Sequence, residues 1–410
     1  MLNITGNPVT YKNFLKPILL LIEDLRELLR YCSVIIEAPR RFGKTSVIKE
    51  FMRQEESKKK KKGEFNVLFL ELEGEETVCD FCFKFYKELL NLYLIRKGVD
   101  TVKNFLDEGL KALSSRLKKI KFSEFEIELR EKTKNYNFLE WKEKITPLIT
   151  DLNSFDFKTL ITFDEFPDML MNFKKKETEE LNFKNTVDGL MAWLRSLRQS
   201  QNDGCKYRFV FCGSINLRKT FEKMGLSKRI NDLEQFVIPP IKNDDAGLLI
   251  ELLAKKYKME IEPEGITFLV SKITGSSPYY GQLLIKALRE KKEKIFTINR
   301  VKEIYKAMLQ GGNHDLNHYH SRLENYMTQT ERECSATILK HLCGSDFQEK
   351  ALYFLLYKKC TYEQFQSILD RLMYEGYIIR DINDNGNIRF VSNILKDWWT
   401  CKVGVKNVCL

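Results

Sequence analysis

The chain has 410 residues, of which 43% are hydrophobic and 30% charged, with only 20 Gly and 9 Pro. This composition excludes wholesale disorder and the fibrous and low-complexity classes, and the length predicts two or three domains. The 68 Lys and Arg exceed the 57 Asp and Glu by 11, so a polyanionic partner such as nucleic acid is allowed but not required.

Two features of the sequence bear on the cellular compartment: the lack of a recognisable targeting segment and the pattern of its cysteines. The N-terminus lacks a charged region followed by a long apolar one, and no apolar run approaches the roughly 18 residues of a membrane span. Cys79 and Cys82 form one CxxC without a second pair, and no carboxylate or Cys convincingly completes a metal site with His314, His318 and His320, so a polar linker is expected there. We therefore expect a cytoplasmic protein with reduced thiols and no membrane partner.

Helices alternate with strands over the first 240 residues. The predicted elements are a helix within the first 30 residues, a strand at 33–37, a helix after it, a solvated lysine loop at 58–62, strands at 66–71, 159–163, 207–212 and 235–238, mainly helical structure at 79–152 with an extended piece at 124–129, and a helix at 187–198. This alternation predicts a parallel sheet with helices on both faces.

The remaining 170 residues are predicted to be mainly helical, with no strand before the C-terminal hairpin. Helices are expected at 244–256, 263–273, 280–291, 299–309, 323–328, 331–343, 347–356 and 362–375, followed by a hairpin at 376–392 with an Asn-Gly turn. Helices followed by such a hairpin are typical of a winged helix. We expect an α/β domain at 1–240, a helical domain at 241–313 and a winged-helix domain at 314–410.

The loop after the first strand carries the clearest chemical motif, APRRFGKT, between a strand and a helix. A P-loop of the pattern GxxxxGK[ST] wraps phosphates in backbone N–H groups at a helix N-terminus. Lys44 would reach the β- and γ-phosphates, and the Thr45 hydroxyl would bind Mg²⁺. The motif departs from the pattern at Ala38, which would weaken binding if that position needs a left-handed backbone. The predicted nucleotide-binding residues of this segment are Ala38, Pro39, Arg40, Arg41, Phe42, Gly43, Lys44, Thr45 and Ser46.

Two further strands end in polar residues. The strand at 159–163 ends in Asp164 and Glu165, as a Walker B strand does, with Asp164 as a Mg²⁺ ligand and Glu165 orienting the attacking water. The strand at 207–212 runs into Ser214 and Asn216, where a polar side chain could sense the γ-phosphate. Ser214 is the preferred candidate, although an ordinary strand-to-turn boundary also explains this segment.

Together these segments resemble the prokaryotic and archaeal-type P-loop ATPases, within the AAA+/STAND-like group of additional-strand NTPases. The resemblance covers nearly the whole chain and rests on NPVTYKNF, EAPRRFGKTSVIKEF, TLITFDEFPDML, WLRSLRQ, FVFCGSINL, RINDLEQFVIPPI and TGSSPYYGQLL. It implies an ATPase core, a helical lid and a C-terminal winged helix, with ATP or ADP and Mg²⁺ as cofactors. The chain departs from the family at residues 15–17, where Leu-Lys-Pro replaces a Gly-Arg pair.

The resemblance also implies lid and arginine contacts. A lid element touches nucleotide in that group and corresponds to GSSP at 275–278, ending in Pro278. Arginine fingers come from a neighbouring subunit in many such ATPases. Arg195 and Arg198 are the first candidates, with Arg218 and Arg229 as alternatives, although each is also expected to be a solvated or ion-paired side chain.

The charge of the C-terminal domain bears on its partner. Residues 321–410 contain 12 Lys and Arg against 11 Asp and Glu, a poor surface for phosphates. Hence we expect an ATPase that acts as a nucleotide-driven switch or regulator, with a protein partner or self-association. The alternative is a nucleotide-gated DNA-binding factor in replication, recombination or mobile-element and defence biology.

Overall fold

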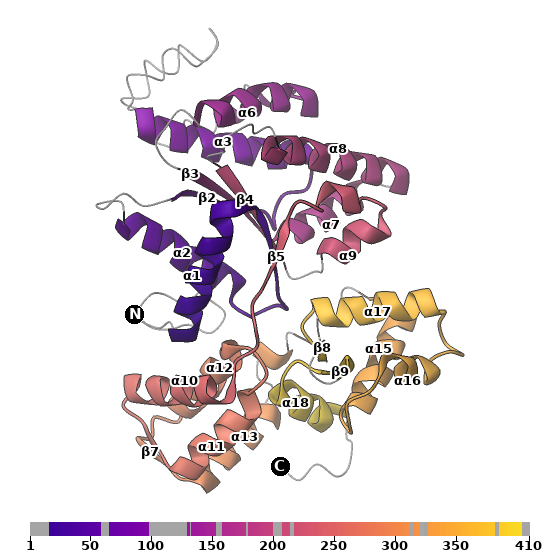
Figure 1. Ribbon diagram of the computed structural model, residues 1–410. Coiled ribbons are helices and arrows are strands. Elements are labelled where there is room, and N and C mark those ends of the chain that lie inside the picture. Colours follow the sequence, from indigo (N-terminus) through magenta and orange to yellow (C-terminus); the bar gives the residue numbers. More distant parts are fainter. Residues whose placement is uncertain are drawn as a thin grey trace. The chain divides into compact units, whose positions relative to one another are not determined.

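The computed structural model (Figure 1) forms two compact units. The sheet unit contains Asp24–Ile36 and Ile48–Phe236, and the C-terminal unit contains Met1–Glu23, Glu37–Val47 and Val237–Leu410. The structure describes residues 16–58, 65–97, 129–131, 133–152, 158–177, 179–199, 207–213, 217–310, 315–317, 319, 321, 323, 327–381 and 385–403.

The sheet unit is built on a five-stranded sheet of order β2-β3-β4-β1-β5. Its strands are β1 (Val34–Glu37), β2 (Phe65–Glu71), β3 (Lys158–Asp164), β4 (Tyr207–Gly213) and β5 (Glu234–Val237). The strands β2, β3 and β4 are parallel, and Phe163 of β3 pairs with Leu70 on one side and Phe211 on the other. β3 and β4 are buried almost throughout, as central strands covered on both faces are. In this order β4 lies between β1 and β3.

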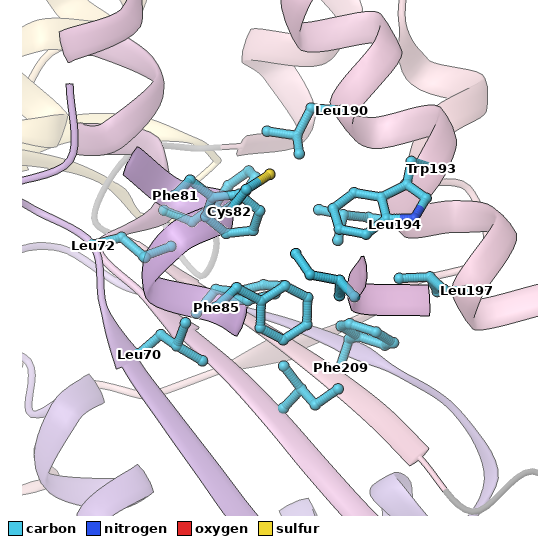
Figure 2. Packing of buried hydrophobic residues seen from close by; sticks show 14 of the residues in the cluster. Leu70, Leu72, Phe81, Cys82, Phe85, Leu190, Trp193, Leu194, Leu197 and Phe209 are labelled. Carbon is cyan, nitrogen blue, oxygen red and sulfur yellow. The ribbon is translucent and has the colours of Figure 1, made fainter. Parts of the chain in front are cut away.

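Helices cover both faces of this sheet. They are α1 (Lys16–Tyr31), α2 (Lys44–Lys58), α3 (Val78–Lys97), α6 (Phe138–Leu152), α7 (Phe166–Lys176), α8 (Glu180–Gln199) and α9 (Leu217–Lys223), followed by the short 3-10 helix η4 (Ser227–Arg229). Figure 1 shows α3, α6 and α8 on one face and α1 and α2 on the other. In Figure 2, Phe81 and Phe85 of α3 and Trp193 of α8 pack over Phe209 of β4. Aromatic burial on this scale makes the core the main stabilising feature of the unit.

The predicted parallel sheet with helices on both faces is confirmed, but two helices differ from the prediction. α7 was not predicted, and α8 begins seven residues before the predicted start at Val187. Pro167 lies in the first turn of α7, where the missing N–H needs no helical partner, so this proline begins a helix instead of excluding one. Of the extended piece predicted at 124–129, only Leu129 is described, and it is helical.

The C-terminal unit begins with four helices, close to the predicted ranges. They are α10 (Asn243–Lys256), α11 (Pro263–Ile273), α12 (Pro278–Arg289) and α13 (Ile298–Gln310). The prediction that strands stop after residue 241 was wrong, because β6 (Glu260–Ile261) and β7 (Ile295–Phe296) form a parallel pair. A two-residue strand is too short to display the period-2 pattern by which strands are recognised.

The last part of the C-terminal unit is the expected winged helix. It comprises α15 (Gln329–Leu342), α16 (Glu349–Phe354), α17 (Tyr362–Tyr374), the antiparallel strands β8 (Ile378–Asp381) and β9 (Asn387–Phe390), and α18 (Asn393–Val403). Capping boxes at Thr328 and Thr361 begin α15 and α17. Asn385 and Gly386 both have positive φ, as a tight hairpin turn requires. The helix predicted at 323–328 does not reach Thr328, which is the extended N-cap of α15, and α18 was not predicted.

Candidate functional site

The backbone between β1 and α2 alternates in handedness. Arg41 has φ 69° and Gly43 has φ 88°, while Phe42 between them is not left-handed. Alternation of this kind is typical of anion-binding nests, in which successive N–H groups turn toward one point; the Phe42 N–H of this segment also donates to Pro39 O (3.3 Å). The nest leads into α2, whose first turn is closed by the bond from Val47 N–H to Gly43 O (2.9 Å). Ala38 is not left-handed, so the extra methyl at that position does not strain the loop.

Lys44 is held across this loop by its own backbone. Its side chain is buried, with 5% of the residue exposed. The ammonium donates to Ala38 O (2.8 Å) and Pro39 O (3.2 Å). These two bonds fix a positive charge beside the nest, which adds to the field of the α2 N-terminus. The arrangement suits a phosphate group, the anion that such a loop and lysine bind together.

The lid segment predicted to approach this loop does so within the C-terminal unit. Ser277 is the N-cap of α12, and its hydroxyl accepts from Tyr279 N–H and donates to Arg41 O. Pro278 follows as the first residue of α12. Pro278 therefore lies one residue from a direct contact with the loop, and its predicted contact with nucleotide stays a prediction.

The Asp-Glu pair ends β3 in a tightly determined turn. Asp164 is 2% exposed, its carbonyl accepts from Leu72 N–H (3.0 Å), and its Oδ1 accepts from Glu165 N–H (3.2 Å). Glu165 has φ 51° and ψ 37°, a left-handed conformation, and begins α7 as its N-cap. The turn thus redirects the chain immediately after the strand and presents two consecutive carboxylates at its end.

Packing against β4 supports this turn. A Cβ added to Gly213, the last residue of β4, would lie 2.3 Å from Pro167 of α7. The rings of Phe166 and Phe211 meet edge to face, with centroids 5.0 Å apart. The two residues after Glu165 are therefore locked onto the neighbouring strand, and this close approach accounts for glycine at position 213.

The predicted sensor and arginine residues have different outcomes. Ser214 and Asn216 lie outside the described residues. Arg198 is buried and forms hydrogen bonds within the sheet unit. It donates to both carboxylate oxygens of Asp232 (2.7 and 3.0 Å) and to Arg229 O (2.8 Å), and 2% of its side chain is exposed. Arg195 lies 3.9 Å from Asp232. Of the two first candidates, Arg195 is the less constrained, and its finger role stays a prediction.

The alternative fingers are also engaged. Arg229 forms a two-bond ion pair with Asp188 (2.7 and 2.8 Å), and the pKa of Asp188 is lowered by this hydrogen bonding. Arg218 donates to Leu233 O. Both side chains therefore hold neighbouring segments of the sheet unit together, Arg229 through an ion pair and Arg218 through a backbone carbonyl.

The oxygen donors predicted for Mg²⁺ fit the chemistry of that ion. Thr45 supplies a hydroxyl in the first turn of α2, and Asp164 supplies a buried carboxylate at the end of β3. Mg²⁺ prefers hard oxygen ligands and takes few of them from protein, filling the rest with water and phosphate. Within the described part of the chain, no cluster of three His, Cys, Asp or Glu could hold a metal by itself.

Cysteine and membrane features add no second site in the described residues. Cys82 is buried in the core, and burial raises the pKa of its thiol well above the usual value. Cys79 donates to Tyr136 O (3.5 Å). His314, His318 and His320 lie outside the described residues, and none of the described helices is long and apolar enough to cross a membrane.

The sheet order, the nest with its lysine and the acidic turn after β3 define the P-loop NTPase fold of the Walker-type ATPases, with an additional strand between the two motif-bearing strands. Comparison with solved structures gives the same fold. The chain is similar to the Walker-type ATPase paby2304 of Pyrococcus abyssi, with 12% identity, 96% of this chain and 98% of that chain covered, and a TM-score of 0.59.

Two further neighbours are more distant. The ORC1 protein of Aeropyrum pernix, solved in complex with DNA, has 10% identity, coverage of 95% and 94%, and a TM-score of 0.45. The RuvB Holliday junction branch migration motor of Thermotoga maritima has 13% identity, coverage of 93% and 92%, and a TM-score of 0.37. No protein-family model and no curated protein matches the chain.

Three tyrosines beside the loop were missed by the sequence interpretation. The Arg41 guanidinium lies over the rings of Tyr279 and Tyr319, and that of Arg40 lies over Tyr374. The first of these contacts joins residues 238 positions apart in the chain. No local spacing signals such a contact, so only the folded chain reveals it.

Proposed function

We propose that the protein is a Mg²⁺-dependent ATPase whose bound nucleotide acts as a switch or regulator. The observation that carries the proposal is the left-handed alternation at Arg41 and Gly43 around a lysine anchored to loop carbonyls. This backbone is built for a string of phosphates, and a nucleoside triphosphate is the ligand for which it is typically used. The fold shared with a Walker-type ATPase supports the same proposal.

Each motif residue has a separate role in this proposal. The loop at residues 38–46 would bind the phosphates, and Lys44 would offset their charge. Thr45 and Asp164 would hold Mg²⁺, which supplies further charge compensation on the phosphates. Glu165 would orient or deprotonate the water that attacks the γ-phosphate. Ser214, Arg195 and Arg198 are proposed as auxiliary residues that sense or stabilise the transferring group.

Two substitutions separate binding from hydrolysis. Lys44→Ala should abolish ADP and ATP binding measured by isothermal titration calorimetry. Glu165→Gln, which removes only the charge, should retain binding while hydrolysis falls at least about tenfold, the lower part of the range for general acid–base catalysis. Wild-type hydrolysis in the Glu165→Gln variant would refute the role of Glu165, and wild-type binding in Lys44→Ala would refute the phosphate site.

The partner of the switch is proposed to be a protein or a second copy of the chain. In a winged helix the third helix would enter the major groove of DNA. Here that helix, α17, carries Arg371 against Glu363 and Asp370, so it offers little positive charge to phosphates. Nucleotide-gated DNA binding remains the alternative, and salt-dependent anisotropy of labelled duplex DNA distinguishes them: binding that falls with salt would favour the alternative.

The proposed place of action is the cytoplasm. All eight cysteines that the structure describes are free thiols. Reduced, unpaired thiols are typical of proteins in that compartment.

A further inference from the structure

The side chain of Arg41 lies against two aromatic residues that belong to the C-terminal unit. Its guanidinium carbon lies 4.3 Å from the ring centroid of Tyr279 and 5.0 Å from that of Tyr319. The guanidinium also donates to the Tyr279 hydroxyl and to Asp315 O (3.4 Å). Tyr279 and Tyr319 are 6% and 4% exposed, so the rings that receive this cation–π contact are largely shielded from water.

The main chain of Arg41 is held as well. The hydroxyl of Ser277, a fully buried residue, donates to Arg41 O. Burial alone would lower the pKa of Arg41, but Tyr319, Tyr279, Tyr280 and Asp315 outweigh it and raise the pKa. The charge is therefore retained inside the aromatic pair, and both ends of the residue are fixed.

Arg41 needs such support because of its backbone. A φ of 69° is unfavourable for any residue with a Cβ, and a P-loop with glycine at this position would not carry that penalty. Without the contacts to Ser277, Tyr279 and Tyr319, the backbone at Arg41 would relax toward right-handed conformations, and the alternation that is typical of a nest would be lost.

The supporting residues connect onward to the winged helix. The Tyr319 hydroxyl is hydrogen-bonded to that of Tyr280 (2.9 Å), and the Tyr377 hydroxyl donates to Tyr319 O. A second contact joins the loop to the winged helix, because the Arg40 guanidinium carbon lies 5.3 Å from the ring centroid of Tyr374 in α17. The state of the loop and the packing of the winged helix are thus joined by direct contacts within one compact unit.

We propose that Ser277, Tyr279 and Tyr319 are positioning residues that hold Arg41 left-handed and thereby keep the phosphate-binding nest formed. This inference rests on the proposed nucleotide binding and names the device that regulates it. Because coupling between two sites is reciprocal, bound nucleotide stabilises the packing of these residues on Arg41, and their release weakens nucleotide binding. The lid and the winged helix accordingly set the affinity of the loop for nucleotide through Arg41.

A double-mutant cycle tests the inference, with the Kd for MgADP measured by calorimetry on the full chain. In the wild-type background, Tyr279→Leu combined with Tyr319→Leu should weaken binding about tenfold, since two cation–π contacts are lost. In an Arg41→Gly background the same pair should change the Kd less than about twofold, because glycine adopts the left-handed backbone unaided. Equal weakening in both backgrounds, or none in the wild-type background, would overturn the inference.

A matched control and a milder variant complete the design. Tyr257→Leu removes a cation–π contact with Arg289 (4.9 Å) elsewhere in the lid and should leave the Kd unchanged. If circular dichroism shows that the double leucine variant does not fold, Ser277→Ala replaces it in the same cycle. MgADP binding should then weaken about threefold in the wild-type background only, and not in the Arg41→Gly background. A wild-type protein that binds no MgADP would instead refute the proposed function, and this inference with it.

Discussion

Two residues of the motifs adopt the same rare backbone conformation but are held in different ways. Arg41 follows β1 and Glu165 follows β3, and both are left-handed without being glycine. Glu165 is supported from within the sheet unit, by Phe166 in the core and by the contact of Pro167 with Gly213. Arg41 is supported by residues far along the chain. The acidic turn is therefore a property of the sheet, whereas the loop conformation depends on the lid and the winged helix.

The largest effect is expected from breaking the support of the acidic turn. Gly213→Ala places a methyl 2.3 Å from Pro167, so the free energy of unfolding should fall by about 1–3 kcal/mol, as it does on overpacking a core. Urea unfolding measures the change. Gly189→Ala in α8 is the matched control, because the nearest atom to its added methyl is 3.8 Å away. That variant should be neutral or more stable by up to about 1 kcal/mol, and equal losses in both would refute the packing argument.

An intermediate effect is expected where an arginine of the sheet unit stabilises the fold through an ion pair. Arg198→Met removes charge-assisted bonds to Asp232 and should cost about 1.5–2 kcal/mol at pH 7. Burial works to raise the pKa of Asp232, but Arg198 outweighs it and the pKa is lowered. A carboxyl group whose pKa is lowered by folding stabilises the folded protein at pH values above its unfolded-state pKa, which is near 4. This contribution is lost as the pH falls through the pKa of the folded state.

The pH dependence supplies the check on this prediction. The stability difference between wild type and Arg198→Met should shrink as denaturant curves are repeated from pH 7 down to pH 3. Arg195→Met, whose guanidinium lies 3.9 Å from Asp232, should cost less at every pH. A difference that does not change with pH would mean that the ion pair is not its source.

The smallest changes in the free energy of unfolding are expected when each of the two left-handed residues is replaced by glycine. Glu165→Gly should raise the free energy of unfolding by about 0.5 kcal/mol, since relief of the backbone slightly exceeds the entropy of glycine. Arg41→Gly should instead lower it by about 1 kcal/mol, because the buried cation–π contacts are lost with the side chain. Thermal unfolding of both variants measures the signs, and shifts in the same direction would contradict the distinction between the two motifs.

Much of the fold was predictable from local sequence. The runs VIIE, LITFD and FVFC are continuous and apolar because the inner strands of a parallel sheet are buried on both faces. The Asn-Gly turn and the capping threonines also act through their own neighbours in the chain. α7 was missed because a proline in the first turn of a helix resembles a proline that ends a segment.

The sequence by itself determined the two motif loops, the strands that carry them and the order in which helices and strands follow. These features depend on periodicity and on contacts between residues a few positions apart. Only the tertiary structure decided that Arg198 serves an ion pair and that Arg41 is held by Tyr279 and Tyr319. The physical reason is that such partners are brought together only when the chain between them folds. Residues far apart in the sequence leave no local pattern that predicts their contact.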